Sequence, residues 1–400
     1  MKKTTFIIGL IATIMTFSSC EDDFIDLEDD LIELNAQEQV YQKNESIIHK
    51  SKLQNKVFIS ESLSNSEIGD YPVRKMQVYT PPGYDQKRAE GYPVVYLLHS
   101  EPFSEKAYTD MRTWDEWVES IGNLNISFDT DRDFPEEGFR LWIDNLIETG
   151  KMEPMIIVMP NAMSYPYGFS MYSNSILNGN FEDFIVYDLV NFIDNRYNTI
   201  ASNEGRAVIG VSQGGYGAFK FGLKHSDIFG AVASHSGLLV VDAVLSLKDF
   251  VLAENPDGFE GPDPDKFLTS AGYAFSAAWS PNLNKPPYFV DLPFEIKEDE
   301  HGVLQIDLVP EVVNRWYQHD VFSLIDTHVD DFKSLKGIYF DVGIDDELGT
   351  GMLYSDLIER LNEKGINYTF ETFEGGHFNK MFSRLEVSLE FCSNALSSSN

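Results

Sequence analysis

A glycine-flanked serine between a buried strand and a helix is the feature that most constrains this chain. Gly210-Val211-Ser212-Gln213-Gly214 follows the apolar residues 207–209 and overlaps the start of a helix-like stretch, residues 213–224. In this setting, G-x-S-x-G is typical of a sharp strand-to-helix turn that projects the serine hydroxyl above a sheet. Glycines on both sides leave out the Cβ atoms that would clash in such a turn. The segment predicts an α/β protein with Ser212 as a nucleophile.

Strand-like and helix-like segments alternate from about residue 51 onward. The predicted strands are residues 73–79, 94–98, 155–159, 207–209, 231–234, 337–342 and 368–373, and the predicted helices include 181–193, 213–224, 353–361 and 385–396. Continuous apolar runs are expected of strands that are buried on both faces. Glu182 is expected in the first turn of its helix, where the helix dipole favours an acid. The alternation predicts one domain, residues 51–400, with a mainly parallel central sheet flanked by helices.

Two long segments interrupt this alternation. Residues 101–140 and 238–330 each follow a predicted strand and are rich in aromatic, proline and acidic residues. Insertions after strands gather at the carboxyl edge of a sheet, where α/β proteins bind their ligands. We expect lid-like or substrate-binding elements within the same domain. Their aromatic rings can stack on sugars or aromatic acyl groups, although such residues more often pack an insertion onto its domain.

Charge and cysteine content exclude several classes of protein. The formal net charge is −34, from 64 acidic and 30 basic residues, and so negative a field repels the phosphate backbone of nucleic acids. The two cysteines, Cys20 and Cys392, are far apart in the chain, which excludes a disulfide framework, and no Cys/His cluster has zinc-site spacing. We expect Cys392 to be a small core residue of the last helix. Neither a metal nor an organic cofactor is expected.

The N-terminal residues resemble the signal of a bacterial lipoprotein. A basic start precedes an apolar run, residues 6–17, that is too short to span a membrane, and two serines precede Cys20. The acidic residues that follow resemble the surface-export signal of Bacteroidetes-type lipoproteins. We expect a signal peptide over residues 1–19, lipidation of Cys20 and an acidic tether over residues 20–50. This arrangement predicts anchoring to the outer membrane, facing the cell surface or the periplasm.

A serine nucleophile needs a base, and the base needs an acid to orient it. In α/β-hydrolases the acid and then the histidine follow the serine in the chain. Of the eight histidines, His377 fits because it lies in a two-glycine loop after the last predicted strand. The acid is expected after the preceding strand, where Asp345, Asp346 and Glu347 are candidates. We take Asp346 as the acid and Asp345 as the alternative.

Further motifs resemble the Putative esterase family of α/β-hydrolases, which includes esterase D, feruloyl and acetyl-xylan esterases and the bacterial mycolyltransferases. The resemblance runs from about residue 73 to the C-terminus. The residues that carry it are Val78-Tyr79-Thr80-Pro81-Pro82-Gly83-Tyr84, Tyr92-Pro93-Val94-Val95-Tyr96-Leu97-Leu98-His99, Asn178-Gly179-Asn180-Phe181-Glu182-Asp183-Phe184, the Ser212 turn with Gly215-Tyr216-Gly217, and Gly376-His377. Asp346 matches the acid at the end of the family's G-x-x-D segment.

The resemblance implies an α/β-hydrolase fold and a serine carboxylic-ester hydrolase with a Ser-His-Asp acyl-enzyme mechanism. Together with a lipid anchor, it implies a small-molecule or oligosaccharide ester as substrate, of the acetylated or feruloylated carbohydrate type. Two alternatives stay open. One is an acyltransferase that uses a sugar or lipid hydroxyl in place of water. The other is a glycan-binding protein with a degenerate hydrolase site.

The second alternative arises from the loop after residue 99. Family members continue Leu-Leu-His with glycine, whereas this chain reads His99-Ser100-Glu101-Pro102-Phe103. We expect the backbone N–H groups of Gln213 and Glu101 to form the oxyanion hole, because Pro102 has no N–H to donate. Loss of one such donor typically lowers turnover about 10²–10³-fold.

Overall fold

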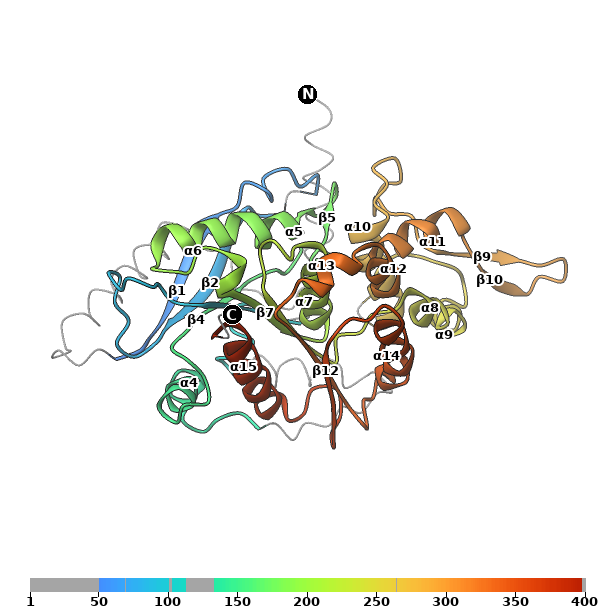
Figure 1. The fold of residues 1–400 in the computed structure, drawn as a ribbon. Helices are drawn as coiled ribbons and strands as arrows, with labels where there is room; N and C mark the ends of the chain where they lie inside the picture. The colour runs from blue at the N-terminus through green and yellow to red at the C-terminus, as the bar shows by residue number, and fades with distance from the viewer. Residues whose placement is uncertain (1–49, 69, 101–102, 113–132, 264, 398–400) are drawn as a thin grey trace, which may run out of the picture. The chain divides into compact units, whose positions relative to one another are not determined.

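A central sheet of eight strands forms the frame of the domain (Figure 1). In the computed structural model, the strands pair in the order β1-β2-β4-β3-β7-β8-β11-β12. The pairs β1–β2 and β2–β4 are antiparallel, and every pair from β4 to β12 is parallel. This confirms the predicted mainly parallel sheet.

The structure describes residues 50–68, 70–100, 103–112, 133–263 and 265–397. The strands are β1 Lys52–Ile59, β2 Val73–Thr80, β3 Val94–Leu98, β4 Ile156–Pro160, β5 Asn174–Ser175, β6 Gly179–Asn180, β7 Arg206–Val211, β8 Ala231–His235, β9 Phe294–Glu298, β10 Leu304–Leu308, β11 Gly337–Gly343 and β12 Thr369–Phe373. The α-helices are α4 Phe139–Glu148, α5 Phe181–Asp183, α6 Val190–Arg196, α7 Gln213–Lys224, α8 Val241–Leu245, α9 Lys248–Glu254, α10 Phe267–Trp279, α11 Pro310–Trp316, α12 Val321–Thr327, α13 Val329–Lys333, α14 Tyr354–Glu363 and α15 Met381–Ser397.

Residues 51–400 belong to one compact unit. The predicted signal peptide, the lipidated Cys20 and nearly all of the predicted tether lie outside the described residues. Within the described residues, no helix is both long and apolar enough to cross a membrane.

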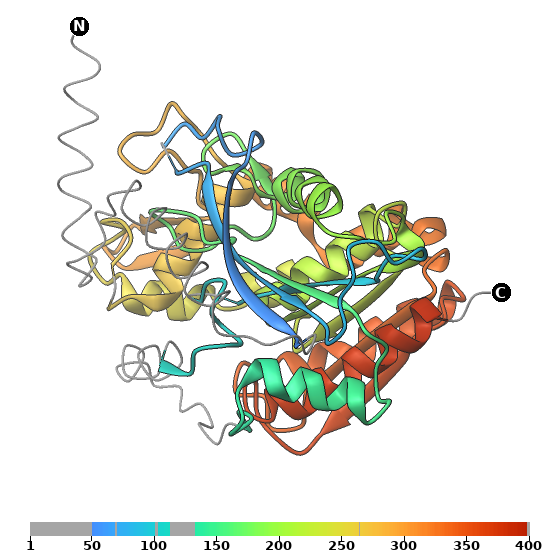
Figure 2. The same cartoon turned by 90° about the vertical axis from the view of Figure 1, so that its left-hand side faces the viewer.

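The sheet separates two hydrophobic cores. In β3, Tyr96 belongs to one core and its neighbour Leu97 to the other, because successive side chains of a strand point to opposite faces. On the second face, α4 and α15 lie side by side in Figure 2, with the rings of Trp142 and Phe382 5.4 Å apart. Cys392 of α15 is buried in this second core, as predicted.

Strand β1 was not predicted from the sequence. Four of its eight residues are polar, and most of its side chains are exposed or half-buried. An edge strand pairs on one side only, and only the last three residues of β1, Val57 to Ile59, form an apolar run, whereas the central strand β3 is apolar throughout. The backbone pairing with β2, from Lys52 opposite Thr80 to Ile59 opposite Val73, defines it instead.

The second predicted insertion forms more than a wall at the sheet edge. It contains α8 to α12, the β9–β10 hairpin and the start of α13. Helices α12 and α13 pack against α7, so part of this segment covers the sheet as a regular layer. Of the first insertion, residues 101–102 and 113–132 lie outside the described part, while Phe103 and Tyr108 are buried in the second core.

Glu182 has a larger structural role than the sequence indicated. It does stand in the first turn of α5, but its side chain is buried among three basic groups of α7 and the residue after it. Glu182 lies 2.9 Å from Lys220 Nζ, 2.6 Å from Lys224 Nζ and 2.8 Å from His225 Nε2. Lys220 also donates to the backbone oxygen of Tyr172. A buried charge needs such partners, and these lie about 40 residues further along the chain, out of reach of local pattern reading.

Candidate active site

Ser212 lies at the turn between β7 and α7, in a backbone conformation that is rare for a side-chain-bearing residue. Its φ is 54° and its ψ is −119°. The backbone N–H of Ser212 donates to the oxygen of His235 at 2.8 Å, which ties the turn to the end of β8. A Cβ added at Gly210 would lie 2.2 Å from the backbone of Gly214, and one at Gly214 would lie 2.2 Å from the oxygen of Leu98. Close backbone approach therefore requires both glycines of the motif.

The structure brings the predicted histidine and acid to this serine. His377, in the loop after β12, places Nε2 2.9 Å from Ser212 Oγ. Its other ring nitrogen, Nδ1, lies 2.7 Å from Asp346 Oδ2. The side chains of His377 and Asp346 are each 1% exposed. Ser212 and His377 are 165 residues apart in the chain, and they meet Asp346 at the carboxyl ends of β7, β11 and β12.

Hydrogen bonds single out Asp346 from its neighbour. Asp346 also accepts from Thr350 Oγ1 at 2.8 Å and from the N–H of Leu348 at 3.0 Å. Burial alone raises the pKa of Asp346, but the bonds and charge from His377, with those from Thr350 and Leu348, outweigh burial and hold the pKa below its usual value. Asp346 is therefore a carboxylate facing the histidine. Asp345 is exposed, and its N–H donates to the backbone of Gly375.

Glu347, the third acid of this loop, holds the histidine loop in place. Its Oε2 accepts the backbone N–H of His377 at 2.6 Å. A Cβ at Gly376 would lie 2.4 Å from Glu347 Oε1, so this glycine leaves room for the carboxylate. Asn379 Oδ1 accepts the N–H of Gly376 at 2.7 Å. The sequence named Glu347 only as a candidate acid, and its supporting role depends on contacts across two loops.

One of the two predicted oxyanion donors can be placed. Gln213 is the first residue of α7, and a first-turn N–H has no acceptor within its own helix. This N–H belongs to the residue that directly follows Ser212, which in α/β-hydrolases supplies one of the two oxyanion donors. The other predicted donor, Glu101, and the neighbouring Pro102 lie outside the described residues.

The loop that leads to Glu101 is anchored by a neutral histidine. The N–H of Ala162 donates to His99 Nε2 at 2.8 Å, and Nδ1 lies 2.8 Å from the oxygen of Ser100. Since Nε2 accepts, the proton resides on Nδ1, which donates to Ser100. Burial lowers the pKa of His99 to about 4. His99 therefore links the ends of β3 and β4 in its uncharged form.

A second Ser-His-Asp set lies in the core. His235 Nδ1 is 2.9 Å from Asp341 and Nε2 is 2.8 Å from Ser388 Oγ. Ser388 and Asp341 are each 0% exposed, so no ester reaches this hydroxyl. The set joins β8 and β11 to α15 through hydrogen bonds.

Among the described residues, no group of three or more His, Cys, Asp or Glu side chains is arranged to hold a metal ion.

The fold and the Ser212–His377–Asp346 arrangement define an α/β-hydrolase with the side chains of a serine hydrolase. A family model described as Putative esterase matches residues 72–385. The chain belongs to this family.

Three comparisons place the chain among known proteins. An esterase of Mycobacterium tuberculosis is 38% identical over 155 residues, which are 38% of this chain and 27% of that protein. The endo-1,4-beta-xylanase/feruloyl esterase of Xylanibacter ruminicola is 27% identical over 203 residues, 50% of this chain and 23% of that protein. The match thus spans about a quarter of the length of these curated relatives. A solved ferulic acid esterase has a TM-score of 0.54 and 18% identity, covering 87% of this chain and 100% of that one, which confirms the α/β-hydrolase fold.

We expect His99 to make the protein sensitive to acid. In the unfolded chain a histidine titrates near pH 6.5, whereas His99 in the folded protein has a pKa of about 4. Between these values only the unfolded state gains the proton, so the free energy of unfolding falls as the pH falls. At pH 5 this site should lower the free energy of unfolding by about 2 kcal/mol relative to pH 7.

Urea unfolding at both pH values tests this expectation. The His99→Gln variant should be less stable at pH 7 but should lose about 2 kcal/mol less on acidification. The matched control is His301→Gln, because His301 is exposed. Equal pH dependence in His99→Gln and the parent would contradict the assignment.

Proposed function

We propose that this protein is a serine carboxylic-ester hydrolase that works through an acyl-enzyme. The observation that carries the proposal is the hydrogen-bonded series from Ser212 Oγ through His377 to Asp346. Family membership supports the same reaction class. A glycan-binding protein with a degenerate site would have no need of this buried series, so the geometry favours the enzyme.

The geometry gives each side chain a distinct task. Asp346 accepts a hydrogen bond from the Nδ1–H of His377. The proton is therefore on Nδ1, and the lone pair of Nε2 faces the serine hydroxyl. At 2.9 Å, Nε2 is within reach to take the hydroxyl proton as Ser212 attacks. The Asp346 carboxylate then stabilises the imidazolium that forms.

The proposed reaction has two steps, acylation of Ser212 and hydrolysis of the acyl-enzyme. Ser212 Oγ bonds to the ester carbon, and the backbone N–H of Gln213 donates to the oxyanion that develops. The carbon–oxygen bond to the alcohol breaks, and the alcohol leaves with the proton from His377. Water then loses a proton to His377 and attacks the acyl-enzyme, which releases the acid and returns the proton to Ser212.

The proposed substrate is a carbohydrate that carries acetyl or feruloyl esters. One relative joins an endo-1,4-beta-xylanase and a feruloyl esterase in a single protein, and this supports an ester bound to a plant polysaccharide. An acyltransferase would form the same acyl-enzyme and use a sugar or lipid hydroxyl instead of water. Product analysis with and without an added acceptor distinguishes the two, because only a transferase yields an acylated acceptor.

We expect a fluorophosphonate probe to form an adduct at Ser212, detected by mass spectrometry. Turnover of a p-nitrophenyl ester should fall at least about 10⁴-fold in Ser212→Ala, because the nucleophile is lost. The matched control is Ser246→Ala, because Ser246 is exposed and belongs to neither Ser-His-Asp set. Labelling at Ser388, or turnover that survives in Ser212→Ala, would sink the proposed mechanism.

Replacing each aspartate by asparagine tests which of the two orients His377. Asp346→Asn should lower kcat by about 10⁴, because the amide no longer holds the reactive tautomer of His377. Asp345→Asn should change kcat little, since the Asp345 side chain is exposed. Steady-state kinetics of both variants decide the point, and a larger loss in Asp345→Asn would reverse the assignment.

We propose further that the protein is a lipoprotein of the outer membrane. The support is the pattern of residues 1–19 before Cys20 and the acidic residues after it. In a bacterial host, the parent should incorporate labelled palmitate and sediment with membranes, and Cys20→Ser should lose both properties. Cys392→Ala, which removes the buried cysteine, is the control. Palmitate labelling that persists in Cys20→Ser would refute the anchor.

A further inference from the structure

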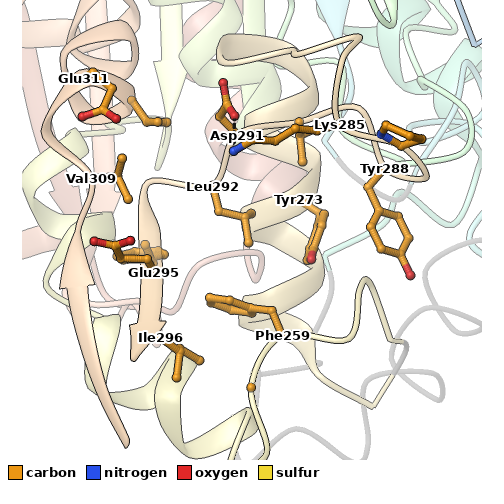
Figure 3. A pocket seen from close by; sticks show the side chains of 15 residues that line it. Phe259, Tyr273, Lys285, Tyr288, Asp291, Leu292, Glu295, Ile296, Val309 and Glu311 are labelled. Atoms are coloured by element: carbon orange, nitrogen blue, oxygen red, sulfur yellow. Dashed lines mark ion pairs between the residues drawn. The ribbon is translucent and has the colours of Figure 1, made fainter. Parts of the chain in front are cut away.

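The second insertion encloses a cavity of about 640 Å³ that the proposed chemistry does not use (Figure 3). We call it the insertion cavity. Residues that define its character are Phe259, Tyr273, Lys285, Tyr288, Asp291 and Glu311. Its volume lies in the range of sites that bind small molecules. Neither Ser212 nor His377 lines it, so it is separate from the reacting groups.

Aromatic rings form one side of the cavity. The rings of Tyr273 and Tyr288 meet edge-on with centroids 5.1 Å apart. In Figure 3, the Tyr273 side chain extends between Leu292 and Tyr288 toward Phe259. Tyr288 is held from both ends, because its hydroxyl donates to the oxygen of Glu260 and its backbone oxygen accepts from Tyr167. These rings are an ordered surface on which a flat apolar face can stack.

The hydroxyl of Tyr273 is available to a ligand. Tyr273 is only 6% exposed, yet its hydroxyl has no hydrogen-bond partner among the residues that the structure describes. Burial raises the pKa of Tyr273 to about 12, so the group remains a neutral donor at physiological pH. The Tyr273 oxygen is not among the fully buried polar atoms that lack a partner in the described residues, so it is open to solvent. A ligand that covers this hydroxyl has to supply an oxygen, because covering it without a partner would be costly.

The charged groups of the cavity disfavour an anionic ligand. Asp291 is neutralised by Lys285 at 2.6 Å and Arg315 at 2.5 Å. Glu295 is paired with Lys297. Glu311 has no ion-pair partner within the described part of the chain and remains a free carboxylate acceptor. Because the described lining residues include no unpaired cation and the chain has a net charge of −34, the cavity offers little to an anion.

A neutral ligand that is rich in hydroxyls and apolar on one face fits these groups. A purely apolar ligand would cover the Tyr273 hydroxyl without giving it a partner, which is unfavourable. A sugar ring satisfies both kinds of surface, because its C–H face covers an aromatic ring and its hydroxyls bond to the phenol and the carboxylate. We propose that the insertion cavity binds a segment of neutral polysaccharide. The proposal rests on the proposed function and assigns the carbohydrate part of the substrate to this cavity.

Helix α10 connects the cavity to the nucleophile. Tyr273 and Trp279 are six residues apart on α10, about 9 Å along the helix. The ring of Trp279 packs 6.0 Å from that of Tyr216, which lies one turn beyond Ser212 in α7. These contacts span roughly 20 Å, a distance that several sugar units of one polysaccharide chain can bridge between Tyr273 and the serine that would cleave its esters.

Binding by the purified protein tests the proposal. Xylohexaose, cellohexaose and mannohexaose are the neutral probes, and isothermal titration measures their affinity. The parent should bind at least one of them. Tyr288→Ala should weaken that binding at least about fivefold through the lost ring, and Tyr273→Phe about threefold through the lost hydroxyl alone. The control Tyr71→Ala, which removes an exposed ring outside the cavity, should bind like the parent.

Kinetics separate failure of this proposal from failure of the proposed function. Tyr288→Ala should raise the KM for an acylated xylan above that of the parent. The same variant should leave the KM for p-nitrophenyl acetate, which has no sugar, close to that of the parent. Absence of ester turnover in the parent would overturn the proposed function and, with it, the substrate role of the cavity. Turnover by a parent that binds no hexaose at millimolar concentration, or binds ferulate alone, would overturn the cavity proposal by itself. Equal binding by the parent and both cavity variants would have the same effect.

Discussion

Close backbone packing around Ser212 is the constraint on which the site depends. Gly210 and Gly214 allow β7, the start of α7 and the end of β3 to approach at distances that a Cβ would forbid. The N–H of Ser212 reaches across to His235, so three neighbouring parallel strands fix the position of one hydroxyl. The positive φ of Ser212 is tolerated because this packing allows no alternative. The Ser212 hydroxyl therefore has one fixed position, within hydrogen-bond distance of His377.

Two buried polar networks support the position of the Ser212 hydroxyl. Glu182 joins the first turn of α5 to three basic groups around α7, which fixes the helix that begins at the nucleophile. His235, whose backbone oxygen accepts from Ser212, has its ring held between Asp341 and Ser388. Such networks are favourable only when every member is paired, and they give the rigid support that a preorganised site requires.

The sequence predicts those features of the fold and site that depend on local residue patterns and on the order of segments along the chain. The turn at Ser212, the parallel sheet and the meeting of His377 with Asp346 follow from strand–motif–strand spacing. It missed β1, where polar residues make up half of the strand and only its last three residues form an apolar run, and the burial of Glu182, whose partners are distant in the chain. The support that Glu347 gives to the histidine loop and the insertion cavity depend on how loops fold back on one another, and no local pattern encodes that.

The order of the strands has a consequence for how such a protein can diversify. Strands β8 and β11 are hydrogen-bonded neighbours, although about a hundred residues separate them in the chain. Their register, Ala231 opposite Gly337, is set by the sheet and not by what connects them. The connection can therefore lengthen or change its surface at small entropic cost, since loop closure grows only slowly with length. New ligand preferences can be acquired in the segment between the two strands while the spacing between nucleophile and acid stays untouched.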